Sequence, residues 1–311
     1  MTDPEINLRG KTMSLTSPLS TPVRNENYLG PITDTNRWDS FQHRPDDIFI
    51  CTPPKCGTTW TQAICATLVF GDADHGIQPG VVSPWIDANF APIEDYLIQV
   101  EAQSHRRFIK THSPLNGIPY FSDCTYLAIF RDPRDCYISG SNHRDNMNDK
   151  ELADIVFPSG DDAFNDWLYA VREPGTWDLQ SVDSLAHFFK SYWAYRDLPN
   201  LHLHHYSDMK KDLKGAISSM SSALGFQYDD AVLADFASAT SFENMKKDAD
   251  QFAPESGKGM WKEESNFFAN GVSNQWIDKL SPLEQSAFID RIHALLPVEE
   301  AQWMMNGNGG Y

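Results

Sequence analysis

The sequence predicts an α/β fold, a single domain with a central parallel β-sheet flanked by helices. Short apolar runs with the length of strands alternate along the 311 residues with longer stretches of helical periodicity. This repetition of strand, helix and strand favours a parallel sheet whose right-handed crossovers cover both faces with helices. No internal repeat or linker divides the sequence, so one domain is expected.

The predicted elements follow one another in a regular order. Residues 1–45, rich in Ser, Thr, Pro and Asn, predict an extended N-terminal arm, and residues 46–304 predict the domain itself. The predicted strands are residues 47–51, 107–111, 125–130 and 201–205, and the predicted helices are residues 59–70, 182–196 and 209–224. Residues 305–311 predict a flexible tail. Because ligands of such sheets bind at the carboxyl ends of the strands, the segments after the strands are the candidate site.

Composition and charge limit the class of function. The chain has 43 acidic and 25 basic residues, a net charge of −18, which disfavours nucleic acid and anionic surfaces and favours a small partner molecule. No apolar stretch reaches the ~20 residues of a membrane span, and no secretory signal is evident. A soluble cytoplasmic protein without membrane insertion is therefore expected. The five cysteines show neither paired nor zinc-ligand spacing, so neither disulfides nor a metal site is expected.

The first predicted strand runs directly into a turn, residues 52–60, and then into a helix. The turn contains Lys55, Gly57, Thr58 and Thr59, so that backbone N–H groups and an ammonium group could together hold a phosphate. The alternative is a plain helix cap by Thr58 or Thr59, with Lys55 in solvent. The turn is not a Walker A motif, because it lacks the second glycine and the Gly-Lys-Ser/Thr ending whose hydroxyl binds magnesium.

Two further predicted strands end in charged or titratable side chains. Lys110 and His112 end the second strand, and an imidazole there could accept a proton near neutral pH, although a lone histidine is more often structural. After the third strand, Arg131 and Ser139 could converge on one anion. The alternative for Arg131 is an ion pair with Asp135 that caps the following helix.

Taken in their order, these segments resemble the cytosolic sulfotransferases that use 3′-phosphoadenosine 5′-phosphosulfate (PAPS). The resemblance covers about residues 46–276 and includes the segments at Tyr206 and Thr240. It implies a fold of the P-loop nucleotide-binding type. It also implies three groups of nucleotide-binding residues: Lys55, Cys56, Gly57, Thr58, Thr59 and Trp60 around the 5′ end, with Trp60 on adenine; Arg131 and Ser139 at the 3′-phosphate; and Tyr206, Thr240 and Phe242 around the adenine.

The same resemblance implies an enzyme that moves a sulfuryl group by in-line displacement from PAPS to the hydroxyl or amine of a small acceptor, leaving 3′-phosphoadenosine 5′-phosphate (PAP). His112 would be the general base, and Lys55 and Lys110 would stabilise charge. The acceptor pocket would be lined by Trp85, Phe90 and His143. Two alternatives stay open: a P-loop phosphotransferase such as a kinase, and a non-catalytic protein that binds an adenine nucleotide.

The sequence departs from this family at several positions. Where the family closes the nucleotide site with Arg-Lys-Gly, the chain has Ala269, Asn270 and Gly271. Binding of the 3′-phosphate is therefore expected to rest on Arg131 and Ser139, with Asn270 and Gly271 contributing without an ionic term. Cys56 replaces the usual serine and predicts a thiol that reagents in solution can modify. The family's C-terminal dimerisation signature is not evident, which leaves a monomer and a homodimer open.

Overall fold

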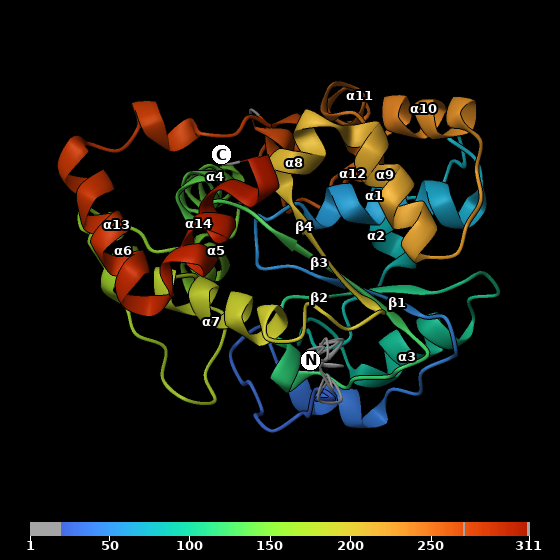
Figure 1. The fold of residues 1–311 in the computed structure, drawn as a ribbon, viewed down its shortest axis with the longest axis horizontal. Coiled ribbons are helices and arrows are strands. Elements are labelled where there is room, and N and C mark those ends of the chain that lie inside the picture. Colours follow the sequence, from blue (N-terminus) through green and yellow to red (C-terminus); the bar gives the residue numbers. More distant parts are fainter. Residues whose placement is uncertain (1–19, 270, 310–311) are drawn as a thin grey trace, which may run out of the picture.

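The computed structural model describes residues 20–269 and 271–309. Within that part of the chain, four strands form the central sheet: β1 (Ile48–Cys51), β2 (Phe108–Thr111), β3 (Thr125–Phe130) and β4 (Leu201–His205). The strands lie in the order β2-β1-β3-β4, and neighbouring strands are parallel (Figure 1). The predicted α/β class with a single parallel sheet is confirmed.

Helices connect and surround the strands. In chain order the α-helices are α1 (Thr58–Phe70), α2 (Pro79–Val82), α3 (Ile93–Glu101), α4 (Pro133–Asn146), α5 (Lys150–Val156), α6 (Ala163–Tyr169), α7 (Val182–Trp193), α8 (Tyr206–Lys211), α9 (Leu213–Ala223), α10 (Asp230–Ala239), α11 (Phe242–Lys247), α12 (Ala249–Phe252), α13 (Pro282–Leu295) and α14 (Val298–Asn306). The 3₁₀-helices are η1 (Thr35–Ser40), η2 (Leu115–Gly117), η3 (Glu264–Phe268), η4 (Gln275–Asp278) and η5 (Gly307–Gly309).

Helices cover both faces of the sheet. Successive side chains of a strand point to opposite faces, so neighbouring residues of one strand pack against different helices. Ile48 and Ile50 of β1 belong to a buried cluster with residues of α1, α9 and α10. Phe49 and Cys51 of the same strand belong to a second cluster with residues of α7, α13 and α14. Figure 1 shows these two groups of helices on opposite sides of the sheet. Burial on both faces explains why the strands could be found as continuous apolar runs.

One predicted helix differs from the structure. The stretch at residues 209–224 was expected to form one helix, but α8 ends at Lys211 and α9 begins at Leu213. Asp212 lies between them with a non-helical backbone (φ −141°, ψ 79°), and its carboxylate accepts a hydrogen bond of 2.9 Å from the N–H of Gly215. The aspartate caps a new helix, and this interrupts a stretch whose apolar spacing alone looks continuous.

The two ends of the predicted domain are partly described. Residues 1–19 of the expected arm lie outside the described residues, whereas Tyr28 and Trp38 further along the arm are buried against the body. Near the C-terminus, α14 and η5 extend to Gly309, and the N–H of Asn308 donates to Asp208. The division into an arm, a domain and a tail stays a prediction.

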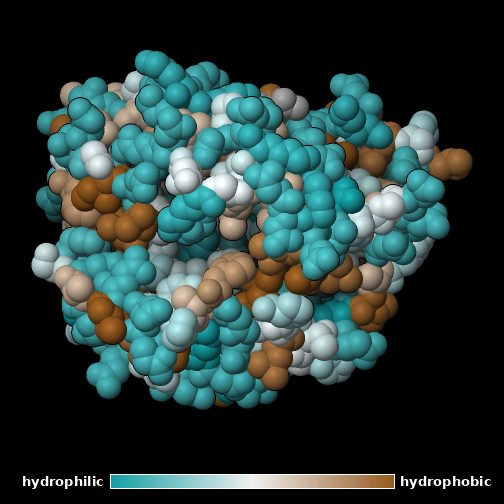
Figure 2. All heavy atoms as spheres, turned by 180° about the vertical axis from the view of Figure 1, so that it is seen from behind, coloured by the Kyte–Doolittle hydropathy of each residue, from teal (hydrophilic) through white to brown (hydrophobic). Residues whose placement is uncertain are grey.

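The surface is mainly polar. Figure 2 shows one face covered largely by hydrophilic side chains, with hydrophobic side chains gathered around a hollow near its middle. Among the described residues, no helix combines the length and the apolar character needed to cross a membrane.

A buried ion pair lies just before the first two strands. Asp47 and Arg107 were expected to begin the strands, but each lies one residue before its strand and both are buried. The guanidinium group of Arg107 donates two hydrogen bonds to the carboxylate of Asp47, one of them 2.8 Å long, and a third to the carbonyl of Gln42. The pair therefore joins β1, β2 and the end of the arm at the amino edge of the sheet.

Removing the acid should leave the buried guanidinium group of Arg107 without its buried carboxylate, so that its remaining acidic partner is the exposed Glu101, 3.0 Å away. We expect Asp47→Ala to lower the free energy of unfolding by about 3–5 kcal/mol, measured by denaturant titration. The control is Asp230→Ala, which breaks an exposed 2.7 Å pair with Lys214 and should cost less than about 1 kcal/mol. Equal losses in the two variants would contradict the structural role given to Asp47.

Candidate active site

The candidate site lies at the carboxyl edge of the sheet. The chain leaves β1 toward β2 on one side and leaves β3 toward β4 on the other, so that a crevice forms between the two connections. A cavity of about 1010 Å³ opens there, lined by residues that follow β1, β2, β3 and β4. The segments singled out from the sequence therefore meet in one place.

The loop between β1 and α1 has the backbone of a phosphate cradle. Lys55 and Gly57 adopt φ values of 70° and 105°, in the left-handed region. The φ angle of Gly57 favours glycine, and a Cβ atom there would also make a tight contact of 3.3 Å with the ring of Tyr206. Within the described residues, no side chain caps α1, while Gly57, Thr58 and Thr59 line the cavity. The plain cap by Thr58 or Thr59 is therefore not formed, and the first N–H groups of the helix remain available for an anion.

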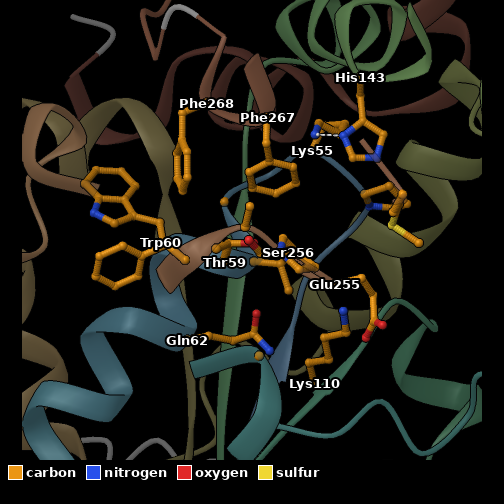
Figure 3. Close-up of a pocket in the computed structure, with 18 of the residues that line it drawn as sticks. Lys55, Thr59, Trp60, Gln62, Lys110, His143, Glu255, Ser256, Phe267 and Phe268 are labelled. Atoms are coloured by element: carbon orange, nitrogen blue, oxygen red, sulfur yellow. Dashed lines mark hydrogen bonds between the residues drawn. The ribbon is translucent and has the colours of Figure 1, made fainter. Parts of the chain in front are cut away.

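Lys55 extends from this loop toward α4. Its ammonium group donates a 2.7 Å hydrogen bond to Nδ1 of His143 and lies 5.0 Å from the centre of the Phe267 ring (Figure 3). Desolvation, with a smaller contribution from the charge of Arg131, lowers the pKa of Lys55 to about 7. The same lysine lowers the pKa of His143, for which desolvation is the larger cause. His143 is thus a neutral acceptor that orients Lys55, rather than only a wall of the acceptor pocket.

His112 has one ring nitrogen fixed and one free for chemistry. Its Nδ1 lies 2.6 Å from the carbonyl oxygen of Thr52, and only an N–H can bond to a carbonyl, so Nδ1 carries the proton. The ring of Trp85 meets the imidazole edge-on at 4.6 Å. Desolvation, followed by the charge of Lys110, lowers the pKa of His112 to about 3. Nε2 is therefore an unprotonated acceptor at neutral pH.

Lys110 lies on β2, two residues before His112. Its ammonium group is 4.8 Å from the centre of the Trp85 ring. Desolvation lowers the pKa of Lys110 to about 8, although the carboxylates of Asp87 and Glu255 act in the opposite direction. Figure 3 shows the Glu255 and Lys110 side chains in the same part of the cavity.

Arg131 connects the cradle to a distant loop. It donates hydrogen bonds of 3.2 Å to the carbonyl of Lys55 and 3.1 Å to the carbonyl of Val272, with its guanidinium group 4.3 Å from the centre of the Tyr206 ring. The predicted alternative was an ion pair with Asp135. The Nε of Arg131 and the nearer carboxylate oxygen of Asp135 are 3.9 Å apart, so this ion pair is long. Among the described residues, the buried Nε of Arg131 has no hydrogen-bond partner. The arginine faces the cavity, as does Ser139.

The expected adenine side of the cavity is aromatic. Trp60 meets Tyr206 edge-on at 5.2 Å, and its indole N–H donates a 2.8 Å hydrogen bond to the carbonyl of Thr240. Thr240 does not itself line the cavity, since its hydroxyl donates to the carbonyl of Phe236. Phe242 lines the cavity and presses directly on Gly271, where a Cβ would fall within the ring.

Besides Thr240, the predicted nucleotide contact Cys56 does not line the cavity. The thiol of Cys56 has 1% exposure and lies 3.4 Å from the sulfur of Cys136, so that it does not face the cavity or solvent. This burial is at odds with the expected reaction with thiol reagents. Asn270 lies outside the described residues.

Several cavity residues were not predicted from the sequence. They are Lys210, Glu255, Trp261, Phe267 and Phe268. Lys210 follows Tyr206 by four residues, a spacing that places both on one helix face once the helix is known. Glu255 and Trp261 lie outside the helices and strands, and Phe267 and Phe268 end the short 3₁₀-helix η3; no periodic pattern reveals the positions of these four residues.

A cluster of metal-ligand side chains lies elsewhere. Within the described ranges, the only group of side chains close enough to share an ion is His43, Asp123 and Cys124. His43 and Cys124 precede β1 and β3, so this group lies at the amino edge of the sheet, opposite the cavity.

Comparison with known proteins gives one consistent result. The sequence model of the sulfotransferase domain matches residues 45–305. A glycolipid sulfotransferase of Mycobacterium tuberculosis is 33% identical over 310 residues, which cover 91% of this chain and 95% of that protein. Human sulfotransferase 1C2 is 24% identical over 298 residues, 89% of this chain and 94% of that protein.

The chain belongs to the sulfotransferase family.

Solved structures of the family share the fold. Retinol dehydratase, crystallised with androsterone and PAP, superposes with a TM-score of 0.68 at 21% identity and covers 85% of this chain and 84% of its own. A mouse sulfotransferase in complex with PAP gives a TM-score of 0.65 at 22% identity, covering 87% and 92%. The P-loop type of fold and the sulfotransferase family, both predicted from the sequence, are thereby confirmed.

The low pKa of Lys55 predicts a pH-dependent affinity of this sulfotransferase for PAP. An anion favours the ammonium form, so above pH 7 binding must take up a proton. We expect the affinity for PAP to fall between pH 7 and 9, by up to about tenfold per pH unit, measured by calorimetry in buffers of different ionisation enthalpy.

The control is Lys55→Gln, which removes this titrating group and should reduce both the affinity and its slope with pH. A wild-type affinity that is constant from pH 7 to 9, without proton uptake, would contradict the position given to Lys55.

Proposed function

We propose that the chain transfers a sulfuryl group from PAPS to a hydroxyl or amine of a small acceptor, with His112 as the general base. The observation that carries this proposal is the geometry of His112, whose Nδ1–H is held by the carbonyl of Thr52 while Nε2 remains an acceptor. Lys55 and Lys110 line the same cavity. A base and two cations in one cavity suit a transfer in which a proton is lost and negative charge develops.

The residues at the carboxyl edge fit a nucleotide with two phosphates. Gly57 leaves the cradle free of a Cβ, and the start of α1 has no side-chain cap among the described residues. At the other position, the buried Nε of Arg131 has no hydrogen-bond partner in the described part of the chain and lies 3.9 Å from the carboxylate of Asp135. Trp60 and Phe242 line the same cavity. No metal ligand is required by this arrangement.

Each catalytic side chain has a distinct role in the proposed in-line displacement. The donor supplies the sulfuryl group and a phosphate leaving group. His112 Nε2 accepts the proton of the acceptor, while Lys55 and Lys110 donate hydrogen bonds to developing negative charge. The pKa of His112 is low in the free protein because of desolvation and Lys110, and a bound anion would offset the charge of that lysine.

The acceptor side of the cavity favours an amphipathic acceptor. Its wall includes Met147, Leu152, Val156, Phe157, Met260 and Trp261, which offer apolar contact. Near the reacting groups the lining becomes polar, with Glu255 and Ser256 beside Lys110 (Figure 3). Such a lining suits a hydroxyl-bearing head on an apolar body. Because the mycobacterial relatives are glycolipid sulfotransferases, we propose a glycolipid-like acceptor.

The two alternative functions have different requirements. A kinase would need magnesium and ATP, and the cradle lacks the Gly-Lys-Ser/Thr ending that serves magnesium. A non-catalytic protein would bind the nucleotide without consuming PAPS. The retained pair of His112 and Lys110 beside the cradle favours catalysis over binding alone.

An acceptor screen distinguishes these functions. The protein is incubated with PAPS and a panel of phenols, alcohols, amines and glycolipids in the presence of a chelator, and products are detected by mass spectrometry. We expect sulfated product and PAP in equal amounts, with glycolipids the best acceptors. Turnover of ATP in a parallel incubation with magnesium and without the chelator, or PAPS left intact with every acceptor, would overturn the proposal.

The assignment of the base gives a separate prediction. His112→Ala should bind PAP with nearly unchanged affinity but lose about 10²–10⁴-fold in kcat, because only proton transfer is removed. The control is His293→Ala, an exposed position on α13, which should leave kcat unchanged. Turnover within a few-fold of the wild type in His112→Ala would contradict the role of this histidine.

A further inference from the structure

In the proposed function, Arg131 is the cation assigned to the second phosphate of the nucleotide. Arg131 is already engaged with the carbonyls of Lys55 and Val272. In the sequence, residues 269–271 read Ala-Asn-Gly and contain no cation. A bound phosphate at this end would therefore depend on cations that come from other elements.

The described lysines and arginines that line the cavity are Lys55, Lys110, Arg131, Lys210 and Lys258. Lys55 and Lys110 lie with His112 and His143 at the reacting end. Lys258 forms a 2.8 Å ion pair with Glu255 in its own segment. Of these five residues, Lys210 is therefore the lysine that could bind an anion together with Arg131.

Lys210 lies on α8, on the helix face that also carries Tyr206. Tyr206 begins α8, and its ring lies under the guanidinium group of Arg131 at 4.3 Å. Lys210 follows one turn later, so its side chain leaves the same face. Its ammonium group donates to the carbonyl of Gly271 and lies 5.6 Å from the centre of the Phe242 ring.

The charges of Lys210 and Arg131 act on each other. Partial burial lowers the pKa of Lys210; Glu243 opposes this shift, and the positive charge of Arg131 adds to it. Two cations close enough to repel are stabilised by an anion placed between them. Ser139, on the first turns of α4, offers a hydroxyl group in the same cavity.

We propose that Lys210 binds the 3′-phosphate of the nucleotide together with Arg131 and Ser139, in place of a cation in the loop at residues 269–271. This assignment rests on the proposed function, since it supposes that PAPS is the donor. Lys210 exchanges the carbonyl of Gly271 for a phosphate oxygen when the nucleotide binds. It acts on binding and not on the reacting atoms.

The chain provides a matched control in Lys246. Its ammonium group donates a 2.7 Å hydrogen bond to the carbonyl of Ala269, in the same loop, and lies 5.9 Å from the centre of the same Phe242 ring. Unlike Lys210, Lys246 does not line the cavity. A lysine that only fixes the loop and a lysine that also binds phosphate can therefore be compared directly.

The test measures the affinity of two ligands by calorimetry in the full chain. The ligands are PAP and adenosine 5′-monophosphate, which lacks the 3′-phosphate. We expect Lys210→Met to lower the affinity for PAP by about 10- to 100-fold and to leave the affinity for the monophosphate unchanged. Lys246→Met should leave the ratio of the two affinities as in the wild type, and Lys210→Arg should restore most of the loss.

Other outcomes would overturn the assignment. An equal loss for both ligands in Lys210→Met would mean that the lysine only positions the loop, and no loss would mean that Arg131 suffices. Thermal unfolding of each variant checks that it is folded. If the wild type itself bound PAP no better than the monophosphate, the proposed function would fail first, which is a different result from a failure confined to Lys210.

Discussion

The guanidinium group of Arg131 joins the two halves of the site. It leaves the end of β3 and reaches the carbonyl of Lys55 in the cradle after β1 and the carbonyl of Val272 in a loop far along the sequence. Asp135, one turn later, accepts 2.8 Å hydrogen bonds from the N–H groups of Asn274 and Gln275 in that same loop. The cradle and the loop are thus held by Arg131, which directly follows β3, and the loop also by Asp135 in the first turn of α4.

The cavity is lined by several positively charged side chains, although the molecule as a whole is negatively charged. The chain carries a net charge of −18, yet Lys55, Lys110 and Arg131 face one desolvated space. The pKa values of the two lysines are lowered, to about 7 for Lys55 and about 8 for Lys110, mainly because their ammonium groups are desolvated; for Lys55 the charge of Arg131 adds to this. An anionic donor offsets this desolvation, which explains how an acidic protein can bind an anionic nucleotide in one place. Contacts made by a few well-placed cations determine binding here, not the average charge of the surface.

Much of this site could be predicted from the sequence because its parts follow strands. The cradle, His112 and Arg131 each come directly after an apolar run, and the parallel order of the sheet brings such segments together. The direction of the Cys56 thiol could not be predicted, because it depends on Cys136 of α4 approaching from another part of the chain. Nor could the break at Asp212, where a local side-chain cap overrides the spacing of apolar residues. Lys210 and Glu255 enter the cavity through contacts between distant segments, which no local pattern records.

The central claim is that one nucleotide spans the crevice from the start of α1 to Arg131. A crystal structure of the full chain with PAP bound tests this claim most directly. The account predicts the 5′-phosphate against the N–H groups of Gly57, Thr58 and Thr59 and near Lys55, the adenine between Trp60 and Phe242, and the 3′-phosphate against Arg131 and Ser139. A nucleotide bound in the reverse direction, or outside the crevice between β1 and β3, would contradict it.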